Sequence, residues 1–108
     1  MDSSDVITLN TTYYTTDAIG QRIAVNVPKQ AFCQVDSVSR SEWFEAGRNG
    51  IKPQYVFTIF RYEYDGELTL EYKGKAYSIY RTYERKDDKI ELYAEARGGV
   101  DNTGEESY

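Results

Sequence analysis

The second half of the chain constrains the fold most, because runs typical of β-strands alternate there with signals for tight turns. Residues 54–64 (QYVFTIFRYEY) are aromatic and β-branched and show no helical period. Three residue pairs signal turns: Asp65-Gly66, Lys73-Gly74 and Asp87-Asp88. The pattern predicts an antiparallel meander of four strands, over residues 54–64, 68–72, 76–84 and 90–96.

Alternation of apolar and polar residues predicts which side chains face the interior. In residues 76–84 we expect Tyr80 to lie on the face opposite to Arg81. In the neighbouring strands the predicted inward residues are Leu68, Leu70, Tyr72, Ile90, Leu92, Ala94 and Ala96.

The first half of the chain is less regular. Residues 6–9 and 21–27 predict two short strands, and we expect Pro28 to end the second because proline cannot donate to a strand ladder. Residues 10–20 (NTTYYTTDAIG) are rich in Thr and Tyr, and we expect an extended segment or a mobile loop. Residues 31–38 alternate less cleanly and predict a further strand.

One short helix is predicted between these strands. Ser39 and Glu42 have the spacing of a capping box, in which the serine accepts from the helix start and the glutamate reaches back to the cap amide. Pro53 blocks any continuation. Two helical turns are not stable alone, so we expect the helix to pack on the sheet through Trp43 or Phe44.

Together these elements predict an all-β, mainly antiparallel fold. We expect a small β-barrel or barrel-like sandwich with one short helix and a mobile loop, formed by a single domain over residues 1–97. Within that domain, residues 1–20 are expected to be extended or mobile.

The excess of acidic over basic residues belongs to the two ends of the chain. Residues 1–20 and 98–108 each carry three acidic residues and no base, whereas the segment between them holds all 13 basic residues against 12 acidic ones. Residues 98–108 (GGVDNTGEESY) predict a flexible acidic tail; the alternative is an acidic arm that docks on a basic partner surface.

The residue inventory argues against catalysis and metal binding. The chain has no histidine, and its single cysteine, Cys33, lies in a predicted strand where a buried small hydrophobe is expected. Four carboxylates near one turn are interleaved with Arg85, Lys86 and Lys89, which indicates an exposed, neutralised hairpin tip. We therefore expect no enzyme, no metal and no cofactor. The sequence has no apolar run long enough for a membrane helix and no apolar segment near Met1 of the kind found in secretory signals. We therefore expect neither feature.

Tyrosine is strongly over-represented, with 11 copies in 108 residues. Aromatic and basic residues interleave in a way that can stack single-stranded bases: Arg61, Tyr62, Tyr64, Lys73, Tyr77, Tyr80, Arg81, Tyr83 and Arg85. Neighbouring acidic residues cancel the charge that nucleic-acid binding needs. Tyrosine also suits half-buried strand positions and protein interfaces, and this interpretation is the one we favour.

Five short motifs follow one another over residues 38–96. They are Ser-Arg-Ser-Glu (39–42), Gly-x-Lys-Pro (50–53), Tyr-x-Gly-Lys-x-Tyr (72–77), Ile-x-Arg-Thr-Tyr (79–83) and Glu-Leu-x-x-Glu (91–95). In order and spacing they resemble the head–tail adaptor, or head-closure (stopper), family of tailed bacteriophages and prophages. The residues before 38 and after 96 carry no matching motif.

The resemblance implies a structural role at the head–tail joint of a virion, after assembly in the host cytoplasm. The implied partners are further copies in a ring, a hexamer or dodecamer, together with a portal-side adaptor, a tail-completion or tail-terminator protein and packaged double-stranded DNA. No membrane partner is implied. The alternatives are a tail-completion or tail-terminator protein at the same joint, and a single-stranded nucleic-acid-binding barrel.

Two sets of candidate residues follow from this hypothesis. The channel-facing set, in the helix–loop segment 39–53, is Arg40, Arg48 and Lys52. The subunit or connector interface set is Tyr13, Tyr14, Trp43, Tyr62, Tyr64, Tyr80 and Tyr93. The alternative for segment 39–53 is a helix that only caps the barrel, and residues 10–20 are a second candidate for a loop that orders on docking.

Overall fold

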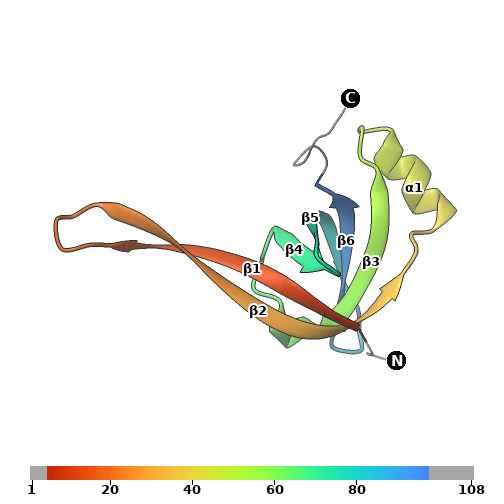
Figure 1. The fold of residues 1–108 in the computed structure, drawn as a ribbon. Helices are drawn as coiled ribbons and strands as arrows, with labels where there is room; N and C mark the ends of the chain where they lie inside the picture. The colour runs from red at the N-terminus through yellow and green to blue at the C-terminus, as the bar shows by residue number, and fades with distance from the viewer. Residues whose placement is uncertain (1–4, 98–108) are drawn as a thin grey trace.

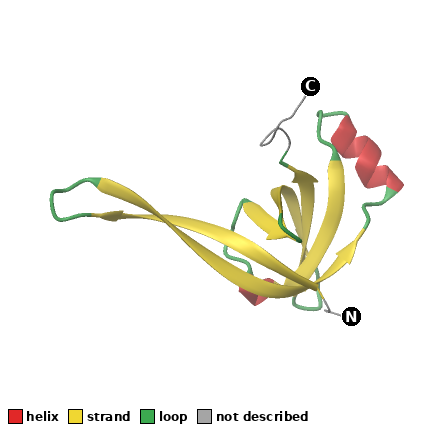
Figure 2. Ribbon diagram, in the orientation of Figure 1, coloured by secondary structure: helices red, strands yellow, loops and turns green. Residues whose placement is uncertain are grey.

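Six antiparallel strands close into a barrel in the order β1-β2-β3-β6-β5-β4 in the computed structural model, which describes residues 5–97 (Figures 1 and 2). The strands are β1 (Asp5–Thr16), β2 (Arg22–Asp36), β3 (Pro53–Phe60), β4 (Thr69–Tyr72), β5 (Lys75–Glu84) and β6 (Lys89–Ala96). A short helix, α1 (Arg40–Gly47), follows β2, and a 3-10 turn, η1 (Arg61–Glu63), follows β3. The predicted all-β barrel with one short helix is confirmed. The predicted acidic tail, residues 98–108, lies outside the described residues.

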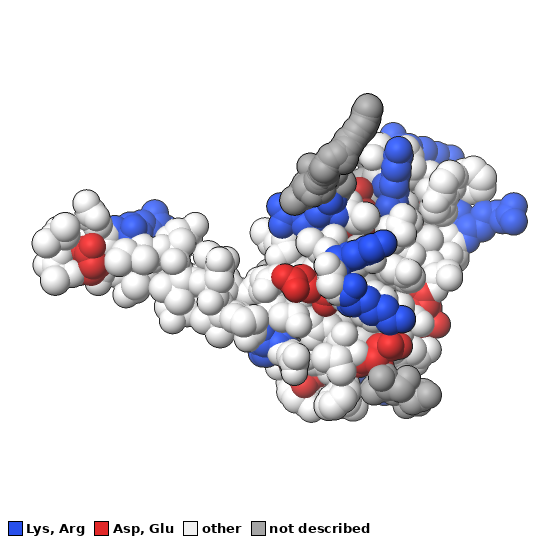
Figure 3. Space-filling model, viewed as in Figure 1, with Lys and Arg blue, Asp and Glu red and all other residues white. Residues whose placement is uncertain are grey.

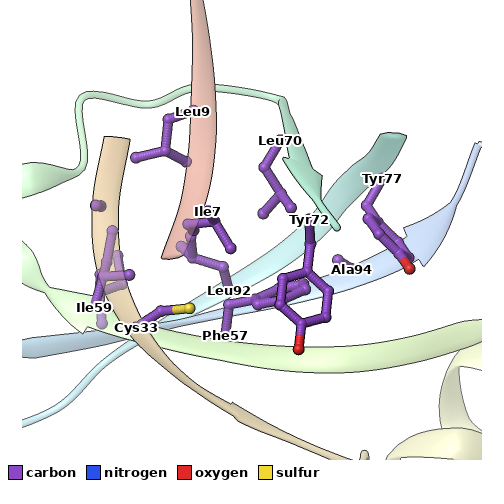
Figure 4. Packing of buried hydrophobic residues seen from close by; sticks show 12 residues of the cluster. Ile7, Leu9, Cys33, Phe57, Ile59, Leu70, Tyr72, Tyr77, Leu92 and Ala94 are labelled. Atoms are coloured by element: carbon purple, nitrogen blue, oxygen red, sulfur yellow. The ribbon is translucent and has the colours of Figure 1, made fainter. Parts of the chain in front are cut away.

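The core lies inside the barrel and is filled by alternate residues of all six strands (Figure 4). Phe57 is fully buried, with its ring centroid 5.2 Å from that of Tyr72 and 5.9 Å from that of Tyr77. Cys33 is buried among these residues, as predicted, and burial raises the pKa of its thiol to about 12. The core residues are Ile7, Leu9, Ala31, Cys33, Phe57, Ile59, Leu70, Tyr72, Tyr77, Ile90, Leu92 and Ala94.

Two of the three predicted turns join neighbouring strands, and the third does not. Lys73-Gly74 connects β4 to β5, with Gly74 at φ 78°, and the turn that contains Asp88 connects β5 to β6. The predicted hairpin at Gly66 is wrong, because β3 pairs with β2 and β6 whereas β4 pairs with β1 and β5. Closing the barrel requires β4 to meet β1, so the chain crosses from β3 to β4 through η1.

Of the two alternatives expected for residues 10–20, the structure shows the extended segment, because most of these residues are strand. β1 and β2 pair from Asp5↔Cys33 to Thr16↔Arg22, and only a short turn joins them. Pro28 does not end β2: it lies within the strand, and β2 pairs with β3 only through Gln34–Asp36. On that side Pro28 therefore stands at an edge with no partner strand among residues 5–97, and its missing N–H is tolerated there.

A β-bulge in β5 overturns the predicted alternation there. Ile79 pairs with Ala94 but Arg81 pairs with Tyr93, which leaves Tyr80 as the extra residue. Tyr80 and Arg81 consequently both approach Tyr93, Arg81 with its guanidinium 3.9 Å from the ring centroid. Two predicted inward residues, Leu68 and Ala96, are exposed; Leu68 precedes β4 and Ala96 ends β6.

Candidate interaction surfaces

The far halves of β1 and β2 form a two-stranded arm, residues 11–27, that projects from the barrel (Figure 1). β1 pairs with β4 only through residues 8–10, so both edges of the arm lack a neighbouring strand within the described chain. The arm contains one acidic residue, Asp17, and one basic residue, Arg22, and Figure 3 shows it as almost entirely uncharged. A surface with so little charge is unusual for a segment that faces water along its whole length.

The two faces of the arm differ in chemistry. The pairs Tyr13↔Val25 and Thr15↔Ile23 place one set of alternate residues on a common face. This face continues the inward positions of Ile7 and Leu9 beyond the barrel. Its large apolar side chains are exposed in three of four cases: Tyr13 is 51% exposed, Ile23 and Val27 are each 42% exposed, and Val25 is half-buried. We call this set, Thr11, Tyr13, Thr15, Ile23, Val25 and Val27, the apolar face of the arm.

The opposite face of the arm is polar and bonded within itself. The Thr12 hydroxyl donates to Asn26 at 2.6 Å, and the Arg22 guanidinium lies 4.2 Å from the centroid of the Tyr14 ring. At the tip, Asp17 accepts the backbone N–H of Ile19 at 3.0 Å, which shapes the turn. The arm is therefore amphipathic, although the barrel covers neither of its faces.

A buried carboxylate ties the root of the arm to the β3–β4 connection. The Glu67 side chain is fully buried and accepts a hydrogen bond from the Thr11 hydroxyl at 2.7 Å and from the backbone N–H of Asp65 at 2.8 Å. The Lys29 ammonium lies 3.4 Å from the same carboxylate. Burial alone would raise the pKa of Glu67, but the hydrogen bonds and Lys29 hold it below its ordinary value.

A polar cleft of about 660 Å³ opens beside this carboxylate, where the arm leaves the barrel. The Glu67 carboxylate is already satisfied by its partners within the chain. No group of three or more carboxylate or thiol ligands suited to a metal occurs in residues 5–97. We therefore interpret the cleft as the structural joint between the arm and the barrel.

Helix α1 is held on the outside of the barrel by polar contacts. The Arg81 guanidinium donates to the Glu42 carboxylate at 2.6 Å and the Tyr80 hydroxyl donates to it at 2.7 Å. These two donors outweigh burial and lower the pKa of Glu42, and burial together with Glu42 raises the pKa of Tyr80. We call these residues, Glu42, Tyr80 and Arg81, the latch.

The latch changes two predictions about α1. Ser39 caps the helix as expected, accepting the Glu42 N–H at 3.1 Å, but the Glu42 side chain serves the latch rather than the cap amide. Trp43 and Phe44 do not pack on the sheet: they are 51% and 57% exposed, and Ala46 is the buried residue of the helix. A strongly bonded carboxylate can hold a short helix where an apolar contact was expected.

The exposed end of α1 carries a shallow groove of about 480 Å³. The Trp43 and Phe44 rings meet edge to face there, with centroids 5.5 Å apart. We call its lining residues, Val38, Ser39, Arg40, Trp43 and Phe44, the α1 groove. Arg40 forms no ion pair with any described side chain.

The three predicted channel-facing residues lie on α1 and the loop after it. Arg40 is the first residue of the helix and Arg48 caps its C-terminal end, where the Arg48 guanidinium pairs with Glu45 at 3.1 Å on an exposed face. The backbone N–H of Lys52 donates to Glu95 of β6 at 3.3 Å. Their role in a channel stays a prediction.

The predicted interface residues divide into two groups. Tyr13, Tyr14, Trp43 and Tyr62 are exposed, as an interface role requires. The other three are half-buried and bonded within the chain: Tyr64 to Glu67, Tyr80 to Glu42 and Tyr93 to Glu91. The tyrosines therefore do not act as one set, and the proposed base-stacking series is likewise dispersed, with Tyr77 inside the core.

Sequence reasoning missed Glu67, the latch and the apolar face. The first two join residues far apart in the chain, so no local pattern signals them. The apolar face did have a signal, since Ile23, Val25 and Val27 alternate with polar or small residues as a half-buried strand does.

Comparison with known proteins establishes the fold. The chain is similar to the solution structure of protein SF1141 from Shigella flexneri 2a, a structural genomics target, with a TM-score of 0.65. The match covers 88% of this chain and 93% of that one at 18% sequence identity. No family model matches the chain, and no curated protein matches it. In residues 5–97 no helix has the length and apolar character needed to cross a membrane.

Proposed function

We propose that the protein is a structural subunit of the head–tail joint of a tailed bacteriophage. In this proposal, copies form a ring below the portal and its adaptor, close the head after DNA packaging and present a docking surface for the tail. The motif order over residues 38–96 suggests the joint. The observation that carries an assembly role is the arm, an amphipathic ribbon whose apolar face is uncovered in the single chain.

The arrangement of charge is compatible with this role. Segment 21–97 holds 13 basic and 12 acidic residues, so the barrel carries almost no net charge. A ring multiplies any charge on its inner wall by its copy number, so a subunit needs few basic residues to face DNA. Arg40, Arg48 and Lys52, on α1 and the loop after it, are the residues proposed to do so.

The test is the location of the protein and the phenotype of its loss. We expect it at the head–tail joint in image reconstructions of purified particles, and we expect particles without it to have heads that leak DNA. Filled, stable heads that lack tails would instead indicate a tail-completion or tail-terminator protein. Presence in tail fibres, or absence from particles, would refute the proposal.

The channel assignment has a separate test. Arg48→Glu with Lys52→Glu should leave folding intact, because Arg48 is exposed and Lys52 contributes its backbone to the contact with Glu95. We expect particles with this change to retain less DNA. Normal DNA retention would assign segment 39–53 the role of a cap on the barrel.

A further inference from the structure

The apolar face of the arm needs a covering surface that its own barrel does not provide. A two-stranded ribbon is marginally stable in water, and independent stability takes a third strand or packing on an apolar face. The side chains of this face, Tyr13, Ile23 and Val27, are each two-fifths exposed or more. Exposed and rimmed by polar residues, such a face marks a site of protein association.

The α1 groove is a second uncovered apolar surface. Helix α1, which carries it, lies at the opposite end of the molecule from the tip of the arm (Figure 1). Trp43 and Phe44 are aromatic side chains of the kind enriched in the centres of protein interfaces. The acid at the tip of the arm, Asp17, and the base in the groove, Arg40, have opposite charges. The other charged residue of the arm, Arg22, lies over the Tyr14 ring on the polar face.

We propose that the arm of one copy docks its apolar face in the α1 groove of the next copy. This inference rests on the proposed ring and identifies the surfaces that would build it. Two different patches on one chain make a head-to-tail contact, the kind that closes into a ring, whereas an arm-to-arm contact would stop at a dimer. From Thr11 to Thr16 the arm spans roughly 20 Å at about 3.4 Å per residue. The shortest dimension of the molecule is 25 Å. The arm is therefore about as long as a neighbouring copy is wide.

Crosslinking between two differently marked full-length chains tests the contact even if it is weak. One chain carries Thr15→Cys on the arm and the other carries Ser41→Cys beside the groove. Native Cys33 is buried, with its thiol pKa raised to about 12, and does not compete for a bismaleimide. We expect this pair to crosslink at least tenfold more than a control pair of Thr15→Cys with Lys86→Cys. Equal yields would overturn the proposal.

Substitutions on the arm test which face makes the contact. Tyr13→Lys with Ile23→Lys, added to the Thr15→Cys chain, should lower the yield roughly tenfold or more. Thr12→Lys with Ala24→Lys adds the same charge to the opposite face and should change it less than about threefold. An equal loss in both would mean that charge, not the apolar face, governs the contact, and would overturn the proposal.

The direction of the contact is tested by moving the substitutions between chains. Trp43→Lys with Phe44→Lys should lower the yield only in the Ser41→Cys chain, and the arm substitutions only in the Thr15→Cys chain. A loss when the arm substitutions are placed in the Ser41→Cys chain would indicate an arm-to-arm contact and overturn the proposal. Circular dichroism confirms folding of each variant. Because the assay uses free chain, its outcome is independent of where the protein lies in a virion.

Discussion

The arm is the continuation of two of the six barrel strands, β1 and β2, yet side chains in the two parts of these strands have opposite environments. In the part of β1 that belongs to the barrel, Ile7 and Leu9 are buried. On the same face of the strand, but in the arm, Tyr13 is exposed. The difference is in neighbours, since β4 and β3 flank the barrel part of β1 and β2 and no described strand flanks the arm. An identical backbone pairing thus gives a cooperative core in one place and a ribbon open to a partner in the other.

The contrast between barrel and arm predicts that truncating a buried side chain in the barrel lowers the free energy of unfolding most. Phe57→Ala removes a ring that is fully buried against Tyr72 and Tyr77, and we expect it to lower the free energy of unfolding by about 3–5 kcal/mol. Val27→Ala on the arm should change it by less than about 0.5 kcal/mol. Urea unfolding followed by circular dichroism measures both. A comparable loss at Val27 would show that the arm belongs to the cooperative unit of the free chain.

The joint between the two regions should be the next most sensitive place. Glu67→Gln removes the charge that faces Lys29 and disturbs the hydrogen bonds of a fully buried carboxylate, so we expect a loss of about 1–3 kcal/mol at neutral pH. Glu71→Gln, at an exposed residue of the same cleft, is the matched control and should have little effect. Similar losses in both variants would contradict a special role for Glu67.

The same joint predicts a pH dependence. The folded-state pKa of Glu67 is lowered, so its contribution to stability is complete above the unfolded pKa of about 4.3 and disappears as the pH falls through the folded value. The stability of the parent protein and of Glu67→Gln, measured by urea unfolding from pH 7 to pH 3, should therefore converge in acid. A constant difference across this range would argue against the lowered pKa.

Helix α1 provides a test of how much polar contacts stabilise an element that lies outside the barrel core. Arg81→Met keeps the aliphatic stem but breaks the latch, and we expect a loss of about 1–2 kcal/mol in the protection of α1 amides from hydrogen exchange. The Arg81 side chain is partly exposed, which limits the effect. Arg48→Met breaks an exposed pair with Glu45 and should leave protection unchanged. Unchanged protection in Arg81→Met would mean that the helix is held by its apolar contact at Ala46.

The parts of this fold that could be predicted are those determined by residues close together in the sequence. The turn at Gly74, the cap at Ser39 and the inward position of Leu92 all depend on residues a few places apart, and the structure has each of them. The choice of strand partners depends on closure of the whole barrel, so the signal at Gly66 indicated a turn but not which strands it would join.

The candidate surfaces divide in the same way. Tyr62 is exposed in the 3-10 turn η1 and Tyr13 is exposed on the arm, whereas Tyr80 is bonded to a carboxylate 38 residues away and is displaced by a bulge. A single extra residue in β5 reverses which side chains share a face, and no composition reveals it in advance. The half-buried position of Tyr80 therefore depends on a distant partner, whereas Tyr64 and Tyr93 bond to residues three and two places away.

The smallest effect gives the sharpest comparison, because the same substitution can be made in both regions. Gly20 at the arm tip and Gly74 in the β4–β5 turn have φ of 86° and 78°, and an added Cβ would meet no atom within 4 Å at either site. Alanine in this conformation is strained by about 1 kcal/mol. In the barrel that strain should appear in full in the free energy of unfolding. At the tip it should only weaken the protection of nearby arm amides, since the arm can open without the barrel. Equal changes in global stability for Gly20→Ala and Gly74→Ala, measured by urea unfolding beside hydrogen exchange, would mean that arm and barrel unfold together and that the free chain already stabilises its arm.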